Sequence, residues 1–134
     1  MGALKTFLVA TLAVTATSAA ALPHSPAERA RTFADCAGRL AALEEHQRLF
    51  DGPASERTAG LRATFLDLLD AVTPDAVAYG LPPEDTLNRR VAARADHRGL
   101  LSRASFATDP LARAPAAEAA SRHIAACTRL IPGA

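Results

Sequence analysis

The stretch that decides the fold, TFADCAGRLAALEEHQRLFDGP, runs from Thr32 to Pro53. Its large apolar side chains and its cysteine recur at intervals of three, four and seven residues, so they share one face of a helix. These side chains are Phe33, Cys36, Leu40, Leu43 and Phe50. The pattern predicts a long amphipathic helix whose apolar face contributes to a core.

The ends of this helix have their own signals. Ser25 is a favourable N-cap, Pro26 suits the first helical position, and Glu28 completes a capping box. At the other end, Asp51-Gly52-Pro53 stops the pattern. We therefore expect the helix to run to Phe50.

Proline and glycine divide the remainder of the chain into three more helical segments. The expected ranges are 55–73, 83–99 and 115–131. A short turn of helix is expected between Pro74 and a break at Gly80, and Asp109 is a candidate cap. In the third segment Leu87, Val91 and Ala95 form the expected apolar stripe, which fades toward Gly99 and leaves a break there possible.

No window alternates apolar and polar residues for long enough to predict a strand, and alanine, leucine, arginine and glutamate dominate the composition. Four amphipathic helices with short connections favour an all-α fold, an antiparallel bundle of about four helices. The chain length suits a single domain over residues 22–134.

The two cysteines are predicted to meet in the core. At about 100° per residue, Leu40 and Leu43 lie within about 40° of Cys36 on its helix, and Ile124 lies within about 60° of Cys127. Bridged Cα atoms lie about 4.4–6.8 Å apart, which requires a close approach of two helices. The small residues beside the cysteines allow it: Ala37, Gly38, Ala120 and Ala126. We therefore expect a Cys36–Cys127 disulfide.

The N-terminus predicts export. Lys5 precedes an apolar run from Phe7 to Val14, and small residues end at Ala19-Ala20-Ala21. This order is typical of a secretory signal peptide, here residues 1–21, which places the mature protein in the periplasm or outside the cell. The alternative is an uncleaved membrane anchor, but the threonines within the run make it a poor membrane span.

Charge excludes one class of partner. The chain has 15 basic and 14 acidic residues, and Lys5 is its only lysine, so cleavage after Ala21 would leave a formal net charge of zero. A neutral domain has no long-range field to attract nucleic acid or an anionic membrane. No nucleic-acid partner is expected, and a membrane is expected only if the signal peptide is retained.

A metal site that uses the same cysteines is the alternative to the disulfide. His123 and Cys127 are four residues apart, and they could bind zinc with Cys36 and either His46 or His97. No second spacing of this kind supports such a site. The cluster Glu44-Glu45-His46 lacks the Glu-x-x-His spacing of di-iron bundles, so it is interpreted as a solvated helix edge. Neither a metal nor a cofactor is expected.

Gln47 and a group of basic residues in the third segment are further candidate contact residues. Gln47 lies within the apolar stripe, where a buried amide must find partners, so it is predicted to be a polar core contact or part of a pocket. Arg90, Arg94 and His97 project to one edge of the third segment, where an anionic partner could bind. The alternative is a solvated face balanced by acidic residues of other helices. Arg98 is expected to pair with a carboxylate across the bundle unless the helix ends before it.

Three segments, CAGRLAALEEHQ, LLDAVTP and IAACTRLI, resemble those of small exported helical bacterial proteins of alphaproteobacterial type with no assigned activity. The resemblance implies the same helical architecture with paired cysteines, and it transfers no functional residue.

No catalytic motif is present, so two binding functions remain. The first expectation is a non-enzymatic protein of the cell envelope that binds another protein. The second is a carrier for a small apolar ligand held between helices, with lining from Phe33, Phe65, Tyr79 and Gln47. A largely exposed apolar stripe on any helix would favour the first, and a closed cavity of several hundred Å³ would favour the second.

Overall fold

A computed structural model describes residues 23–133. This part of the chain forms four helices and no strand: α1 (Pro26–Gln47), α2 (Gly52–Ala78), α3 (Asp85–Phe106) and α4 (Pro110–Thr128). The predicted all-α fold is confirmed. The predicted signal peptide, residues 1–21, lies outside the described residues. None of the helices within 23–133 is both long enough and apolar enough to span a bilayer.

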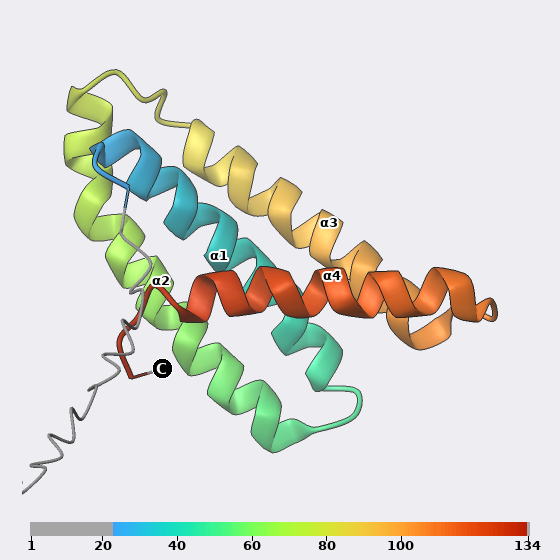
Figure 1. Ribbon diagram of the computed structural model, residues 1–134. Helices are drawn as coiled ribbons and strands as arrows, with labels where there is room; N and C mark the ends of the chain where they lie inside the picture. The colour runs from blue at the N-terminus through green and yellow to red at the C-terminus, as the bar shows by residue number, and fades with distance from the viewer. Residues whose placement is uncertain (1–22, 134) are drawn as a thin grey trace, which may run out of the picture.

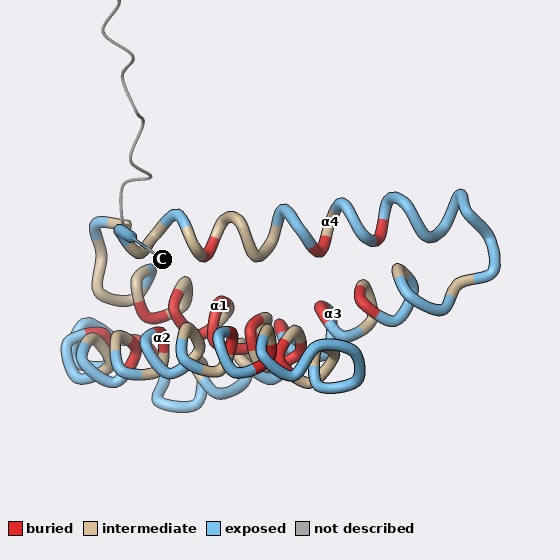
Figure 2. Tube along the Cα trace, turned by 90° about the horizontal axis from the view of Figure 1, so that it is seen from below, coloured by how far each residue is buried: buried red, intermediate tan, exposed pale blue. Residues whose placement is uncertain are grey.

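Consecutive helices run antiparallel, as the bundle prediction requires (Figure 1). The helices do not occupy the corners of a square, however. Helices α1, α2 and α3 form one layer with α1 in the middle, and α4 crosses one face of that layer (Figure 2). The close backbone contacts join α1 to each of the other helices and α3 to α4. Because two turns of direction separate them, the neighbouring helices α1 and α3 run parallel.

Helix α1 begins where its capping signals predict. The side chain of Ser25 accepts a hydrogen bond from the backbone N–H of Glu28 at 3.1 Å, and Pro26 occupies the first turn. The helix ends at Gln47, three residues before the expected end at Phe50. Phe50 is 65 % exposed and is therefore not a core residue.

Helix α2 continues through Thr73 and Pro74 to Ala78, so the predicted end before Pro74 is wrong. Proline removes one backbone donor from a helix. Pro74 therefore cannot donate to the carbonyl of Asp70, and the hydroxyl of Thr73 donates to the preceding carbonyl, that of Leu69, at 2.6 Å. The chain turns only at Gly80, whose φ of 96° is readily adopted by glycine.

The predicted ends of α3 and α4 also need correction. Helix α3 passes through Gly99 without a break and ends at Phe106. Helix α4 begins at Pro110 rather than Pro115, and Pro115 lies inside it. Asp109 is its N-cap, as the sequence indicates, and accepts a hydrogen bond from the N–H of Leu111 at 2.9 Å.

The buried face of α3 differs from the predicted one. Leu87 and Val91 are 51 % and 59 % exposed, whereas Ala93, His97 and Leu101 are buried. The cause lies on α1, where Gly38 allows the backbones to meet. A Cβ atom at Gly38 would lie 2.3 Å from the carbonyl oxygen of Arg90. A small-residue face of α3 therefore packs on α1, and the leucine and valine turn outward.

The core lies on both sides of α1. The rings of Phe33 and Phe65 pack with centroids 6.1 Å apart, and both are buried. A second, smaller cluster joins α1, α3 and α4 through Ala42, Leu101 and Ala120.

The Cys36–Cys127 disulfide is confirmed, with a Cα–Cα distance of 5.6 Å. It ties the C-terminal end of α4 to the middle of α1, and both cysteines are buried. Gly38, which was expected to help this approach, instead faces α3.

Candidate functional site

Salt bridges join α1 to α3 along their length. Going along both helices in the same direction, Arg31 pairs with Asp85 at 3.2 Å and Asp35 with Arg89 at 2.7 Å. Farther along, Glu45 pairs with two arginines of α3, Arg94 and Arg98. These pairs follow the parallel course of the two helices. Arg98 therefore pairs with a carboxylate across the bundle, as expected for a helix that continues beyond it.

The charge of Glu45 is stabilised by these contacts. Burial opposes its ionisation, but hydrogen bonds from Arg98 and Arg94 and the charges of both guanidinium groups outweigh burial and lower the pKa of Glu45. Arg94 is therefore committed to α1, and the predicted anion-binding edge of Arg90, Arg94 and His97 does not exist as such. His97 is on a different, buried face of the helix.

The Glu44-Glu45-His46 cluster joins helices and is not a solvated edge. Glu44 is only 3 % exposed, and its two oxygens pair with Arg48 of the following turn and with Arg62 of α2. The Nε2 atom of His46 lies 2.9 Å from the hydroxyl oxygen of Ser105 at the end of α3. The cluster thus links α1 to α2 on one side and to α3 on the other.

Gln47 makes the polar contact that its position suggests. It is half-buried, and its side-chain oxygen accepts a hydrogen bond from the hydroxyl of Thr58 at 2.6 Å. This contact joins the end of α1 to the second turn of α2.

The zinc alternative fails because both of its cysteines are consumed by the disulfide. Among residues 23–133, no three side chains of histidine, cysteine, aspartate or glutamate gather so as to hold a metal ion.

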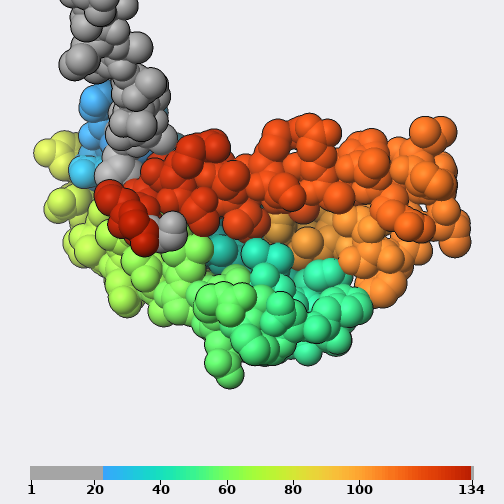
Figure 3. All heavy atoms as spheres, turned by 60° about the horizontal axis from the view of Figure 1, so that its bottom comes forward, coloured from blue at the N-terminus to red at the C-terminus, as the bar shows by residue number. Residues whose placement is uncertain are grey.

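Two adjoining hollows lie beneath α4. The first, of about 510 Å³, is open to solvent and bordered by α1, α3 and α4, and apolar side chains such as Leu43, Leu101 and Ile124 line it. The second, of about 610 Å³, lies between α4 and the α1–α2 pair. Leu43, Ile124 and Thr128 belong to the walls of both. We call the combined hollow the α4 trough. It opens on the face in Figure 3, where α4 forms one rim and α2 with the end of α1 forms the other.

His97 is the polar side chain buried in the wall of the trough. Its ring has no exposed surface, and neither nitrogen has a hydrogen-bond partner among the described residues. Burial lowers the pKa of His97 to about 4, and the positive charges of His123, Arg39 and His46 act in the same direction. The imidazole is therefore neutral at pH 7, with one donor and one acceptor unused.

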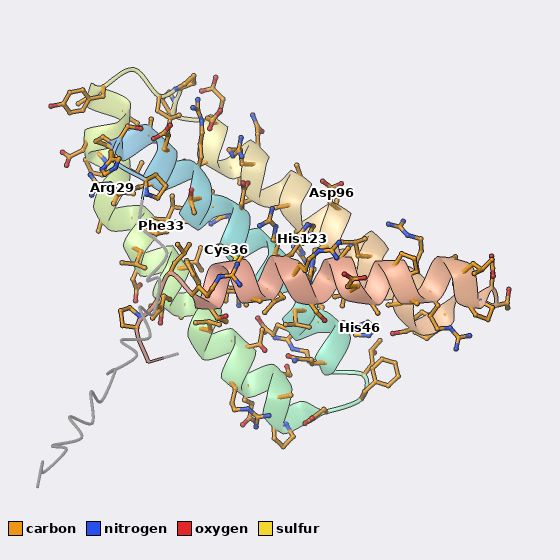
Figure 4. The ribbon with its side chains drawn as sticks, viewed as in Figure 1. Arg29, Phe33, Cys36, His46, Asp96 and His123 are labelled. Atoms are coloured by element: carbon orange, nitrogen blue, oxygen red, sulfur yellow. A yellow bond between two sulfur atoms is a disulfide. The ribbon has the colours of Figure 1, made fainter. Side chains whose placement is uncertain are left out.

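His123 lies beside it, although His123 does not line the trough, and the charge of Arg39 acts on both rings. The rings of His97 and His123 have centroids 5.9 Å apart, and Figure 4 shows His123 where α4 passes over the layer. Burial, with the charges of Arg39 and Arg122, lowers the pKa of His123, against a weaker opposite effect of Asp96. Arg39 forms no salt bridge with any of residues 23–133.

The predicted ligand-lining residues are mostly elsewhere. Phe33 and Phe65 fill the core, and Tyr79 is 79 % exposed at the end of α2. Gln47 alone belongs to the trough, in its second part. His97, which was expected at the exposed edge with Arg90 and Arg94, is instead buried in the wall of the trough. Ala93, His97 and Leu101 do recur every four residues, but the larger Leu87 and Val91 gave a stronger apolar signal.

Comparisons with models of protein families, with curated proteins and with solved structures find no match for this chain. The geometry of the trough therefore carries the functional argument.

Proposed function

We propose that this protein is an exported, non-catalytic carrier that holds a small apolar ligand in the α4 trough. One observation carries the proposal: an open apolar hollow of about 510 Å³ has a fully buried histidine without partners in its wall. Small-molecule sites are apolar concavities of about 300–1,000 Å³ with a few polar groups that fix orientation.

The composition of α4 explains the space. The helix packs on the layer through small side chains, such as Ala116 and Ala120, and it is fixed at one end by the disulfide. Alanines cannot fill the volume between three helices, so apolar walls remain accessible. A ligand that covers these walls would gain about 25 cal/mol per Å² of apolar surface removed from water.

Export is supported by two independent features. The N-terminal sequence has the order of a secretory signal peptide. Disulfides of this structural kind persist in oxidising compartments. A carrier in the periplasm or outside the cell would move an apolar molecule through water.

Dye binding tests the carrier function. We expect the neutral apolar dye Nile red to bind the purified protein. Ala104, on the α3 wall of the trough, is replaced by phenylalanine to fill the space, and Ala104→Phe should weaken binding by about tenfold or more. The control Ala92→Phe adds the same ring at an exposed position of α3 and should bind like the wild type. Equal binding by all three proteins would contradict a site in the trough.

A second function, binding of another protein, is favoured by an exposed aromatic cluster. Phe50 and Phe106 have ring centroids 6.3 Å apart, both pack against His46, and Leu49 beside them is also exposed. The cluster lies where the α1–α2 connection meets the end of α3. Exposed apolar surface of this kind is common at interaction sites.

Co-purification from the native envelope tests this second function. A specific partner should be retained by the tagged wild type and lost with Phe106→Ser. The control Leu111→Ser changes another exposed apolar side chain, at the start of α4, and should retain the partner. Equal recovery with all three proteins would show that the cluster does not bind it.

A further inference from the structure

The face of the three-helix layer opposite α4 carries no helix within residues 23–133 (Figure 2). A groove of about 360 Å³ lies there between α2 and α3, with α1 as its floor. Helices α2 and α3 have no close backbone contact with each other in the described part of the chain, so α1 alone separates them. We call this hollow the outer groove. Its apolar lining consists of Ala37, Ala41, Leu66, Leu87 and Val91.

The outer groove is separate from the α4 trough. The two share no lining residue, and α4 contributes nothing to the groove. On α1, Ala41 lines the groove and Leu43 lines the trough. At about 100° per residue these two positions lie about 200° apart around the helix, so they face opposite sides of the layer. A molecule bound in the groove would therefore leave the trough open.

The apolar part of the groove suits another helix. Its floor is formed by alanines of α1, and small side chains allow helix axes to approach closely. Leu87 and Val91, which are 51 % and 59 % exposed, form the wall on α3, and the half-buried Leu66 forms the wall on α2. Binding of an amphipathic helix in an apolar groove is a common mode of protein recognition.

The charged lining of the outer groove is entirely positive and consists of Arg62, Arg90 and Arg94. Glu44 and Glu45 adjoin the groove, and each of them is shared by two arginines. Arg90 forms no salt bridge with any of residues 23–133. Five arginines thus accompany two carboxylates, which leaves an excess of positive charge at this face.

From the combination of an open apolar groove with this excess of positive charge, we propose that the outer groove binds an acidic amphipathic helix of a partner protein. The apolar face of that helix lies on Ala41, Leu87 and Val91, and acidic residues along its flanks face the arginines. This surface is independent of both functions proposed above, because it includes no residue of the trough and none of the cluster around Phe50 and Phe106.

Charge disfavours a second copy of this chain as the occupant. A symmetric dimer places the same patch of both molecules in contact. It would bring Arg62, Arg90 and Arg94 of one molecule against the same arginines of the other. Like charges opposed across an interface suppress association, whereas an acidic partner meets complementary charge and associates faster.

Binding of a designed peptide to the whole protein tests the proposal. The probe is a labelled peptide of about 20 residues with leucine at the a and d positions and glutamate at the e and g positions of its heptads, so that like charges oppose its pairing with itself. The comparison peptide has lysine in place of each glutamate. In fluorescence anisotropy we expect the glutamate peptide to bind at least about tenfold more tightly than the lysine peptide. Equal affinities, or no binding of the glutamate peptide, would overturn the proposal.

Variants of α3 locate the site. Leu87→Gln and Arg90→Gln should each weaken binding of the glutamate peptide by about fivefold or more. The controls are Leu111→Gln, at another exposed leucine, and Arg103→Gln, at another arginine of α3 without a salt bridge in the described part of the chain. Both controls should bind the peptide like the wild type. If they lose as much affinity as the two variants, the groove is not the site.

Nile red distinguishes the outer groove from the trough. Saturating glutamate peptide should leave the dye bound, and Leu87→Gln should bind the dye like the wild type, because the two hollows share no residue. Displacement of the dye would place the peptide in the trough and overturn the groove. Peptide binding without any dye binding would refute the carrier function alone. In sedimentation, a dimer that Leu87→Gln dissociates would assign the groove to a second copy and contradict the acidic partner.

Discussion

Gly38 sets the distance between α1 and α3. A methyl group there would meet the backbone oxygen of Arg90 at 2.3 Å and the side chain of Ala93 at 3.1 Å. Backbone atoms of a packed helix cannot move aside independently, so the two helices would have to separate. The salt bridges between them, and the position of His97, both depend on this contact.

The substitution Gly38→Ala tests the contact. Although alanine favours helix over glycine, overpacking should lower the free energy of unfolding by about 1–3 kcal/mol. Gly60→Ala is the matched control, because a Cβ there meets nothing within 4 Å, and it should stabilise by about 0.5–1 kcal/mol. Urea denaturation measures both, and a stabilised Gly38→Ala protein would show that the helices are not in contact at this point.

His97 also couples stability to pH. Its pKa is about 4 in the folded protein, against 6.5 for an unperturbed histidine. Between these values the unfolded chain binds more protons than the folded one, so stability is lost as the pH falls from about 6.5 to about 4. At about 1.4 kcal/mol per pKa unit, the loss should reach about 3 kcal/mol.

Urea denaturation at pH 7 and at pH 4.5 measures this loss. His97→Gln cannot titrate and should lose clearly less stability on acidification, while His24→Gln, at an exposed position, should behave like the wild type. A wild-type loss that persists unchanged in His97→Gln would assign it to other groups.

Among the helices, α1 and α3 show how far sequence reasoning extends. The start of α1 could be predicted because its cap is local: Ser25, Pro26 and Glu28 suffice to specify it. The orientation of α3 about its own axis could not be predicted, because it depends on the size of the side chains that α1 presents to it. A glycine and alanines on α1 make a small-residue face of α3 the better fit, so Leu87 and Val91 remain exposed. The trough was missed for the same reason, since His97 acquires its place only from this orientation.

Prolines within two helices led to predicted helices that are too short. The sequence pattern predicts helix boundaries at Pro74 and Pro115, but each lies inside a helix that packing and capping extend. Proline in a helix interior is tolerated when the surrounding contacts outweigh the missing hydrogen bond.

Replacement of Pro115 measures that penalty in α4. Pro115→Ala restores a backbone donor at an exposed position. It should raise the free energy of unfolding by about 1–3 kcal/mol and therefore raise the melting temperature. Pro110→Ala changes the first helical position, where proline costs little, and should have a small effect. A lower melting temperature for Pro115→Ala would show that the proline is required by the bend or packing of α4.

At the scale of the whole molecule, α4 lies across a layer of three helices and is joined to it by small side chains and one disulfide (Figure 2). The pairing of Cys36 with Cys127 could be predicted because both cysteines lie on core-facing stripes in a chain whose N-terminal sequence predicts export. The layered arrangement could not, because the stripes alone fit a square bundle equally well. That arrangement leaves the trough.

Loss of the disulfide should therefore affect both stability and binding. The bridge spans 91 residues of sequence, and loop-entropy arguments give it up to about 4–5 kcal/mol. The double variant Cys36→Ala/Cys127→Ala should melt several degrees lower and bind Nile red more weakly, because α4 is no longer held over the layer. An unchanged melting temperature would show that the bridge contributes nothing to stability.

The most direct test is to find where the ligand lies. Nuclear Overhauser contacts between the protons of bound Nile red and the methyl groups of the protein would report it. We predict contacts to Leu43, Leu101 and Ile124, which line the α4 trough. Contacts confined to Leu87 and Val91, on the exposed face of α3, would contradict the account.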